Sequence, residues 1–348
     1  MTFRSALVTG GTGFIGSHLT EALLARGCHV TIIDDLSTGR WENIAHLEHN
    51  PLLRVIIASA DDRDLADKEV PQHEFVYHLA SAVGVRLIID QPVKTVETIV
   101  NTTAVILKAC ARYRRPVLIT STSEVYGKSS EIPFREDASV VMGPTEKRRW
   151  AYACAKALDE FLGLAHYYET SLPVYTVRLF NTVGPRQTGQ YGMVLPTFID
   201  QALAGKPLTV FGDGKQRRCF CSVHDVVEGL LRLPLVPEAA GKVVNLGSQE
   251  EISIEELARR VIALAESGST IEYVPYERAY GAGFDDMCRR VPDLQRARRL
   301  IGWNVKYGID AIIRELLEHH AARSGGAEVV PVRHGARRSP VEADLVAG

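Results

Sequence analysis

The chain of 348 residues is 46% hydrophobic, which is enough for one large domain or two modest ones with a buried core. Its 40 Lys and Arg residues nearly balance its 42 Asp and Glu residues, so its overall charge does not favour binding to nucleic acid or to an acidic membrane. The 6 cysteines lack CxxC spacing and the 11 histidines lack an HExxH motif, a pattern that predicts reduced thiols and no bound metal. Because no apolar run has the length of a membrane span and no signal peptide is visible, we expect a cytoplasmic protein without a membrane partner.

The first half of the chain alternates β-branched apolar runs with helical stretches. Apolar runs of this kind are typical of a parallel sheet that helices cover on both faces. The alternation predicts a doubly wound α/β fold of the Rossmann type. We expect strands at Ala6–Thr9, His29–Ile33, Leu53–Ala58, Phe75–Leu79 and Val117–Thr120, and helices at Phe14–Arg26 and Pro92–Tyr113.

A glycine-rich loop, Thr9–Gly16, lies between the first expected strand and the first expected helix. Its glycines at positions 10, 13 and 16 suit a tight turn, a close approach of backbone to a pyrophosphate, and packing of helix against strand. The following helix offers unpaired N–H groups and the positive end of its dipole to phosphates. The loop therefore predicts a dinucleotide site.

Acidic residues follow the second and third expected strands. Asp34 comes 18 residues after Gly16, where a carboxylate accepts hydrogen bonds from the adenosine ribose and repels a 2′-phosphate. Asp35 shares this position, and Asp61 and Asp62 are placed to meet the adenine. These residues favour NAD over NADP.

Tyr152 and Lys156 lie four residues apart on a helix expected over Ala151–Tyr168, and therefore on one face of it. An ammonium beside a phenol favours the phenolate, so this pair predicts a base that works near neutral pH. Taken alone, the spacing is equally typical of a packed tyrosine beside a solvated lysine. Its combination with the dinucleotide loop and with the cluster Thr122–Glu124, which includes Ser123, predicts a site that takes a hydride from a carbinol.

The second half is less regular. A strand is expected at Val174–Leu179, and Ser253 with Glu256 forms a capping sequence for a helix that continues to about Ala265. We expect a Rossmann domain over residues 1–180 and a smaller C-terminal substrate-binding lobe mainly over 181–322, some elements of which return to the first domain. Residues 323–348 are expected to form a flexible tail.

With these pieces in order, the chain resembles the extended short-chain dehydrogenase/reductase superfamily, and within it the NAD-dependent epimerase/dehydratase family of nucleotide-sugar enzymes. The resemblance covers residues 1 to about 320. It rests on Thr9–Gly16, Asp34, Ala60–Asp64, His78–Ala80, Thr122–Gly127, Tyr152, Lys156, Arg178–Asn181, Gly184–Arg186, Leu208–Gly214, Gln216–Asp225 and Asn245–Gly247.

The resemblance implies a bound NAD, a UDP-sugar substrate that is oxidised transiently at C4, and a homodimer formed through the helices at Pro92–Tyr113 and Ala151–Tyr168. It implies a pyrophosphate site at Asn181 and Arg218 and a base pocket at Phe211. It also implies that NAD contacts Gly10, Gly13, Phe14, Ile15, Gly16, Leu79, Ala80, Tyr152 and Lys156.

The chemistry that follows C4 oxidation has three alternatives by resemblance. Glu124 and Arg290 match UDP-glucuronate decarboxylases of the UDP-xylose synthase type, and this is the favoured function. Gly84–Arg86 is similar to the corresponding stretch of UDP-glucuronate 4-epimerases, so a 4-epimerase of UDP-glucuronate or UDP-glucose is an alternative. Thr122–Gly127 is also similar to a stretch of GDP-mannose 4,6-dehydratases, so a nucleotide-hexose 4,6-dehydratase is a further alternative. A non-catalytic NAD sensor is a further alternative, which the intact Tyr152 and Lys156 argue against.

One departure from the family pattern is visible. The helix over the nicotinamide side usually carries Asn-x-x-Gly-Thr, whereas this chain has Ile99, Thr102 and Thr103 at those positions. The departure bears on the packing of the cofactor rather than on its use.

Overall fold

The computed structural model describes residues 3–81, 90–189, 193–275, 278, 287 and 289–324. A seven-stranded sheet forms the centre, with strand order β11-β6-β5-β4-β1-β2-β3 and every pairing parallel. The strands are β1 (Ser5–Thr9), β2 (His29–Asp34), β3 (Leu53–Ile57), β4 (Phe75–His78), β5 (Val117–Thr122), β6 (Val174–Leu179) and β11 (Lys242–Leu246).

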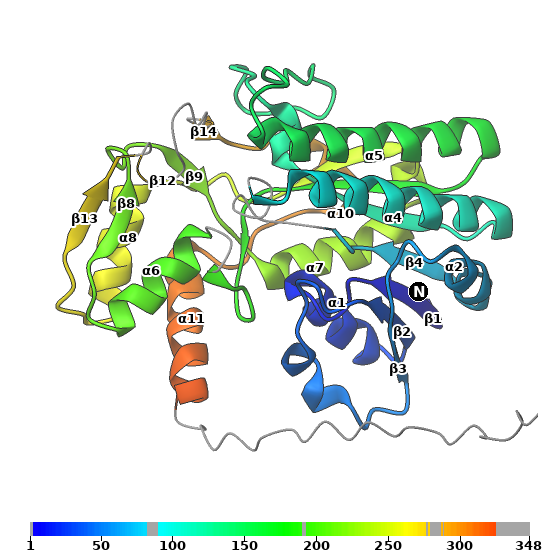
Figure 1. Ribbon diagram of the computed structural model, residues 1–348, viewed down its shortest axis with the longest axis horizontal. Helices are drawn as coiled ribbons and strands as arrows, with labels where there is room; N and C mark the ends of the chain where they lie inside the picture. The colour runs from blue at the N-terminus through cyan, green and yellow to red at the C-terminus, as the bar shows by residue number, and fades with distance from the viewer. Residues whose placement is uncertain are drawn as a thin grey trace, which may run out of the picture.

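Helices cover both faces of this sheet (Figure 1). One face packs against α1 (Phe14–Leu24), α7 (Val223–Arg232) and α10 (Gln295–Ile301) through a core that includes Leu19, Leu230 and Ala297. The other face packs against α2 (Arg63–Glu69), α4 (Pro92–Tyr113) and α5 (Arg149–Thr170). The three layers confirm the doubly wound α/β fold predicted from the sequence.

The chain order of the strands reverses on either side of β1, which lies between β2 and β4. In open parallel sheets, ligands bind beyond the carboxyl ends of the strands at such a reversal. The glycine loop follows β1 at this point, and Asp34 is the last residue of the neighbouring β2.

A second group of elements packs around a core that includes Phe198, Leu257 and Ile312. It consists of α6 (Val194–Leu203), α8 (Ile254–Leu264) and α11 (Ile309–Ser324), with β8 (Leu208–Phe211) paired to β13 (Ile271–Val274). Close by, β9 (Arg217–Cys219) pairs with β12 (Glu251–Ser253) and β14 (Arg289–Arg290), and β7 (Thr182–Val183) pairs with β10 (Cys221–Ser222). Figure 1 shows this group to one side of the central sheet.

The expected elements are confirmed with small shifts at their ends. Ser253 caps α8 through its side chain, which accepts a hydrogen bond of 3.1 Å from Glu256 N. Helix α5 begins at Arg149, two residues before the predicted start at Ala151, and this brings Arg149 into the helix that carries Tyr152. Among the described helices, none is long and apolar enough to span a bilayer.

Candidate active site

A cavity of about 900 Å³ runs from the glycine loop, past Tyr152 and Lys156, to the strands of the second group. Its size is at the upper end of the range for small-molecule sites, as expected for a site that holds a dinucleotide and a nucleotide-linked substrate together. Of the residues predicted for the site, it brings together Gly10, Gly13, Phe14, Ile15, Gly16, Asp34, Asp35, Leu79, Ala80, Thr122, Ser123, Glu124, Tyr152, Lys156, Asn181, Phe211, Arg218 and Arg290.

The glycine loop needs glycine for steric reasons. Gly10 has φ +74°, and a Cβ there would lie 2.7 Å from the backbone nitrogen of Ala80. A Cβ on Gly16 would collide with the carbonyl oxygen of Gly10. Because α1 begins directly after Gly13, its first N–H groups face the cavity, where they can bind phosphate oxygens.

Asp34 holds the loop to the end of β2. Its side chain is buried, with Oδ2 accepting from Thr12 N at 2.9 Å and Oδ1 accepting from Leu36 N at 2.9 Å. Each oxygen keeps a second lone pair for a ribose hydroxyl. Asp35 also lines the cavity, and its Oδ1 accepts from Ser37 N at 2.9 Å.

Asp61 and Asp62, predicted to meet the adenine, are exposed and do not line the cavity. Asp62 caps α2 instead, since its Oδ1 accepts a hydrogen bond of 3.0 Å from Leu65 N. The cavity wall after β3 is formed by Ser59 and Ala60.

These features fit NAD. The glycine cradle and the start of α1 would hold the pyrophosphate, and Asp34 would hold the adenosine ribose. Tyr152 and Lys156 line the same cavity and would lie on the nicotinamide side.

Tyr152 is buried in helix α5 and faces Thr122, the last residue of β5. Burial and the nearby Glu124 carboxylate raise the pKa of Tyr152, and a hydrogen bond with Thr122 acts in the opposite direction. The sequence predicts that Lys156 lowers this pKa, but in the structure burial outweighs the groups that favour the phenolate. Lys156 is itself buried, its ammonium donates to Asp159 Oδ2 at 2.9 Å, and the Asp159 charge adds to the rise in the pKa of Tyr152.

Glu124 lies between two arginines. Its carboxylate contacts Arg290 Nη1 at 2.6 Å and Arg149 Nη2 at 3.2 Å, and the side chains of all three residues are no more than 13% exposed. Two guanidinium groups stabilise the ionised carboxylate and can donate hydrogen bonds to further anionic oxygens. Ser123, which is buried, precedes Glu124 in the short helix η4 (Ser123–Tyr126).

Arg149 is a site residue that the sequence reasoning missed. One signal was the basic run Lys147–Arg149 shortly before Tyr152, a pattern that is more often a solvated surface. In the structure, Lys147 and Arg148 are exposed, whereas Arg149 is buried and lines the cavity.

The departure noted on α4 affects packing around the tyrosine. Ile99 is fully buried and packs with Tyr152 and Ala155. Thr102 lines the cavity and donates to Thr98 O at 2.7 Å. An apolar side chain at position 99 therefore supports the ring of Tyr152.

The far end of the cavity is basic and lies on short strands. Arg290 of β14 pairs in register with Arg218 of β9, so the two guanidinium groups start from adjacent strands. Asn181 donates to the carbonyl of Cys219 at 2.9 Å, which ties the end of β6 to β9. Phe211, the last residue of β8, completes this wall. Arg86, predicted to meet the substrate, lies outside the described residues.

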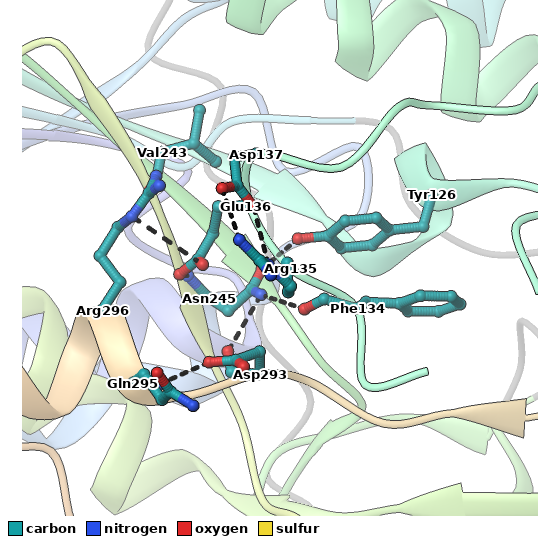
Figure 2. A network of polar contacts seen from close by, with 10 residues as sticks. All are labelled: Tyr126, Phe134, Arg135, Glu136, Asp137, Val243, Asn245, Asp293, Gln295 and Arg296. Atoms are coloured by element: carbon teal, nitrogen blue, oxygen red, sulfur yellow. Dashed lines mark hydrogen bonds and ion pairs between the residues drawn. The ribbon is translucent and has the colours of Figure 1, made fainter. Parts of the chain in front are cut away.

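Figure 2 shows a polar network that fixes the segment after Arg290. Asn245 of β11 accepts from the Tyr126 hydroxyl at 2.8 Å and donates to the carbonyl oxygens of Phe134 and Asp293. Tyr126 ends the helix that carries Glu124, and Asp293 follows Arg290 by three residues. The network therefore holds the two ends of the Glu124–Arg290 ion pair relative to the central sheet.

Comparison with known proteins adds the family. The family model of GDP-mannose 4,6 dehydratase matches residues 7–316. The chain belongs to this family. It is therefore an NAD-dependent enzyme of the nucleotide-sugar epimerase and dehydratase class, which confirms the resemblance inferred from the motifs.

Two curated relatives are decarboxylases by name. The UDP-N-acetyl-alpha-D-glucosaminuronate decarboxylase of Bacillus cytotoxicus is 38% identical over 316 residues, 90% of this chain and 97% of that protein. UDP-glucuronic acid decarboxylase 4 of Arabidopsis thaliana is 37% identical over 87% of this chain and 65% of that protein.

A solved structure shares the family fold. The UDP-glucuronic acid 4-epimerase of Bacillus cereus, in complex with UDP-glucuronic acid and NAD, matches with a TM-score of 0.82 and 27% identity over 92% of this chain and 99% of that one. The fold therefore accommodates different outcomes on related substrates, and the outcome for this chain is argued from its own site residues.

Proposed function

We propose that this enzyme decarboxylates a UDP-linked glucuronate to the corresponding UDP-pentose by transient oxidation at C4. The observation that carries the proposal is the Arg149–Glu124–Arg290 cluster beside Tyr152 in one cavity. Buried guanidinium groups suit a substrate carboxylate. The names of the relatives from Bacillus cytotoxicus and Arabidopsis thaliana support the same chemistry.

The mechanism assigns a task to each side chain. NAD, held by the glycine loop and Asp34, would supply the hydride acceptor for C4 and the hydride donor that restores C4 at the end of the cycle. Tyr152 takes the proton of the C4 hydroxyl and Thr122 hydrogen-bonds the C4 oxygen. The resulting β-keto acid breaks its C5–C6 bond, carbon dioxide leaves, and the electron pair forms an enolate that is protonated at C5. Arg290 and Arg149 orient the carboxylate, and Glu124 keeps both arginines in place. Glu124 assists the protonation at C5 by orienting a water that donates the proton, and Tyr152 returns its proton to the C4 oxygen when the hydride returns.

The test is a proton NMR time course with NAD and either UDP-glucuronate or UDP-N-acetylglucosaminuronate. We expect loss of the C6 carboxylate and appearance of a UDP-pentose. A product inverted at C4 that keeps its carboxylate would replace the proposal by a 4-epimerase, and a 4-keto-6-deoxy product from a neutral nucleotide hexose would replace it by a dehydratase. Tyr152→Phe should lower the rate by about 10²–10⁴-fold, and normal turnover by this variant would contradict its role as the base.

We further propose that two copies of the chain pair through α4 and α5, which pack against each other (Figure 1). On these helices Val93, Leu158, Phe161 and Tyr168 are exposed by 69%, 51%, 65% and 73%. Apolar side chains on adjacent helices suit a two-fold interface. Light scattering should give twice the mass of the chain, and Phe161→Asp should give monomers. Tyr273→Asp, a matched change at an apolar residue of β13 that is 48% exposed, should leave the dimer intact; a monomeric wild type would contradict the proposal.

A further inference from the structure

The catalytic lysine has a buried anionic partner that the proposed mechanism does not use. Lys156 and Asp159 lie three residues apart on α5, their charged atoms are 2.9 Å apart, and their side chains are 4% and 2% exposed. Asp159 does not line the cavity, so it does not reach a ligand there. Its second oxygen, Oδ1, is also buried and makes no hydrogen bond of good geometry with the described residues. Because burying a carboxylate costs free energy, the presence of Asp159 beside Lys156 points to a role of the carboxylate that acts through the lysine.

A line of hydrogen-bonding groups connects Asp159 to the cofactor loop. The Thr103 hydroxyl of α4 interacts with the Asp159 carboxylate, and it lies 3.1 Å from Nε2 of the fully buried His78. On the other side of the ring, His78 Nδ1 lies 2.7 Å from Thr9 Oγ1. Thr9 Oγ1 in turn accepts from Ala80 N at 3.3 Å, and Ala80 lines the cavity against Gly10.

The chemistry of these groups sets the direction in which they can hydrogen-bond. Thr103 is close enough to Asp159 to act on its pKa, and a carboxylate only accepts, so a Thr103 hydroxyl turned toward Asp159 accepts from His78 Nε2. Burial lowers the pKa of His78 to about 3, so the ring is neutral and its Nδ1 accepts from the Thr9 hydroxyl. The polarity is therefore consistent from the backbone beside the cofactor loop to the catalytic lysine.

We propose that Asp159 is a positioning residue for the Lys156–Tyr152 pair, and that Thr103, His78 and Thr9 link it to the backbone of Ala80 beside the dinucleotide loop. The proposal rests on the roles assigned above to Tyr152 and Lys156. Asp159 holds the ammonium in one orientation, and its negative charge sets how strongly the lysine acts on the phenol. With Glu124, it raises the pKa of Tyr152.

The other charged and titratable groups around this pair come from every neighbouring element. They are His78 of β4, Glu124 of η4, Arg178 of β6, Arg290 of β14 and Glu160 of α5 itself, while α4 contributes the hydroxyl of Thr103. Glu160 is paired with Arg178 at 2.7 Å, so its charge is compensated. Asp159 is the carboxylate that offsets Lys156 directly.

The first experiment measures the pH dependence of NADH formation in a single turnover of the uronate substrate by Asp159→Asn. We expect the rate constant to fall at least tenfold with KM within twofold, and the acidic limb of the profile to move to lower pH by about one unit. Thr103→Val should reduce the rate in the same direction, and Thr103→Ser should restore it. Glu169→Gln, at an exposed acid on the same helix, is the matched control and should behave as wild type. A purely structural Asp159 would leave the pH profile unmoved, and that result would overturn the proposal.

The second experiment does not depend on turnover. A double-mutant cycle measured by urea unfolding combines Asp159→Asn with Lys156→Met. We expect the product of the two single fold-changes in the folding equilibrium constant to exceed the fold-change of the double variant by at least tenfold. If the wild type turned over no nucleotide uronate, the proposed function would fail, while coupling in this cycle would still support the Asp159 anchor. Absence of coupling would overturn the anchor whatever the substrate.

Discussion

Arg149 gains its place in the site from its position in the helix rather than from its neighbours in sequence. As the first residue of α5, it is one turn before Tyr152, and it points into the cavity toward Glu124. Its guanidinium and that of Arg290 reach the same carboxylate from different elements. Because α5 and β14 are far apart in sequence, this cluster depends on the correct fold of both groups of elements.

We expect Arg149→Gln to lower kcat/KM for the uronate substrate by about 10–100-fold, because it removes a charge-assisted hydrogen bond in a buried cluster. Arg149→Lys should recover only part of the loss, since a lysine cannot form the planar fork. Arg148→Gln, an exposed neighbour, is the matched control. The rates come from the NMR assay above, and equal loss in the two glutamine variants would place Arg149 outside the site.

Individual residues differ in how far the sequence predicts them. The glycine loop, Asp34, Tyr152 and Lys156 carry fixed spacings that chemistry requires, and the structure places all of them on one cavity. Asp62 was misplaced because a strand-end acid serves equally well as a helix cap. The partners of Lys156 could not be predicted, since the i,i+3 spacing to Asp159 is visible in sequence but its burial is not.

At the scale of elements, the network around Asn245 joins three segments that are distant in sequence. Glu136 accepts from Asn245 N at 3.0 Å, Phe134 N donates to Val291 O at 2.8 Å, and Asp293 N donates to Phe134 O at 2.8 Å. Figure 2 shows Phe134, Glu136 and Asp293 around Asn245 of β11. The segment between β14 and α10 is therefore fixed mainly by polar contacts, several of them made by one side chain.

Asn245→Ala should reduce the free energy of unfolding by about 3 kcal/mol, because it removes the buried partner of the Tyr126 hydroxyl and of the Asp293 carbonyl and leaves Phe134 O with Asp293 N alone. Urea denaturation measures the change, with the exposed Asn304→Ala as the matched control. We also expect kcat/KM to fall more than the affinity for NADH, since the network supports Arg290 and lies away from the glycine loop. A loss below 1 kcal/mol would contradict the role given to Asn245.

The central strands were predictable because each is a continuous apolar run between turn residues. The short strands β12 and β14 were not predicted, because they have only three and two residues, while β9 was expected only as a strand around Cys219. The three strands lie at residues 217–219, 251–253 and 289–290. Because β9 pairs with both of the others, the pairing depends on contacts between distant parts of the chain. The site residues that lie on them were placed by resemblance, not by periodicity.

At the scale of the whole molecule, buried histidines couple folding to pH. Burial lowers the pKa of His78 to about 3 and that of His18, next to the glycine loop, to about 4. Both rings are neutral in the folded protein at pH 5, whereas the unfolded chain binds protons below its ordinary value of about 6.5. His224 acts in the opposite sense, because its bond with Glu315 raises its pKa, so its contribution is present below about 6.5 and is lost as pH rises.

The contribution of these two histidines to stability should therefore fall as pH decreases from 6.5 toward 4, since at His18 and His78 the unfolded state binds more protons than the folded state over this window. Each fully shifted histidine contributes a loss of about 2 kcal/mol between pH 6.5 and 5. We expect the urea midpoint of His18→Gln to change less between pH 7 and pH 5 than the urea midpoint of the wild type. Exposed His29→Gln is the matched control and should keep the wild-type slope. Parallel stability curves for wild type and His18→Gln would show that the buried ring does not couple to protons, because removal of a group with a lowered pKa must flatten the curve between pH 4 and 6.5.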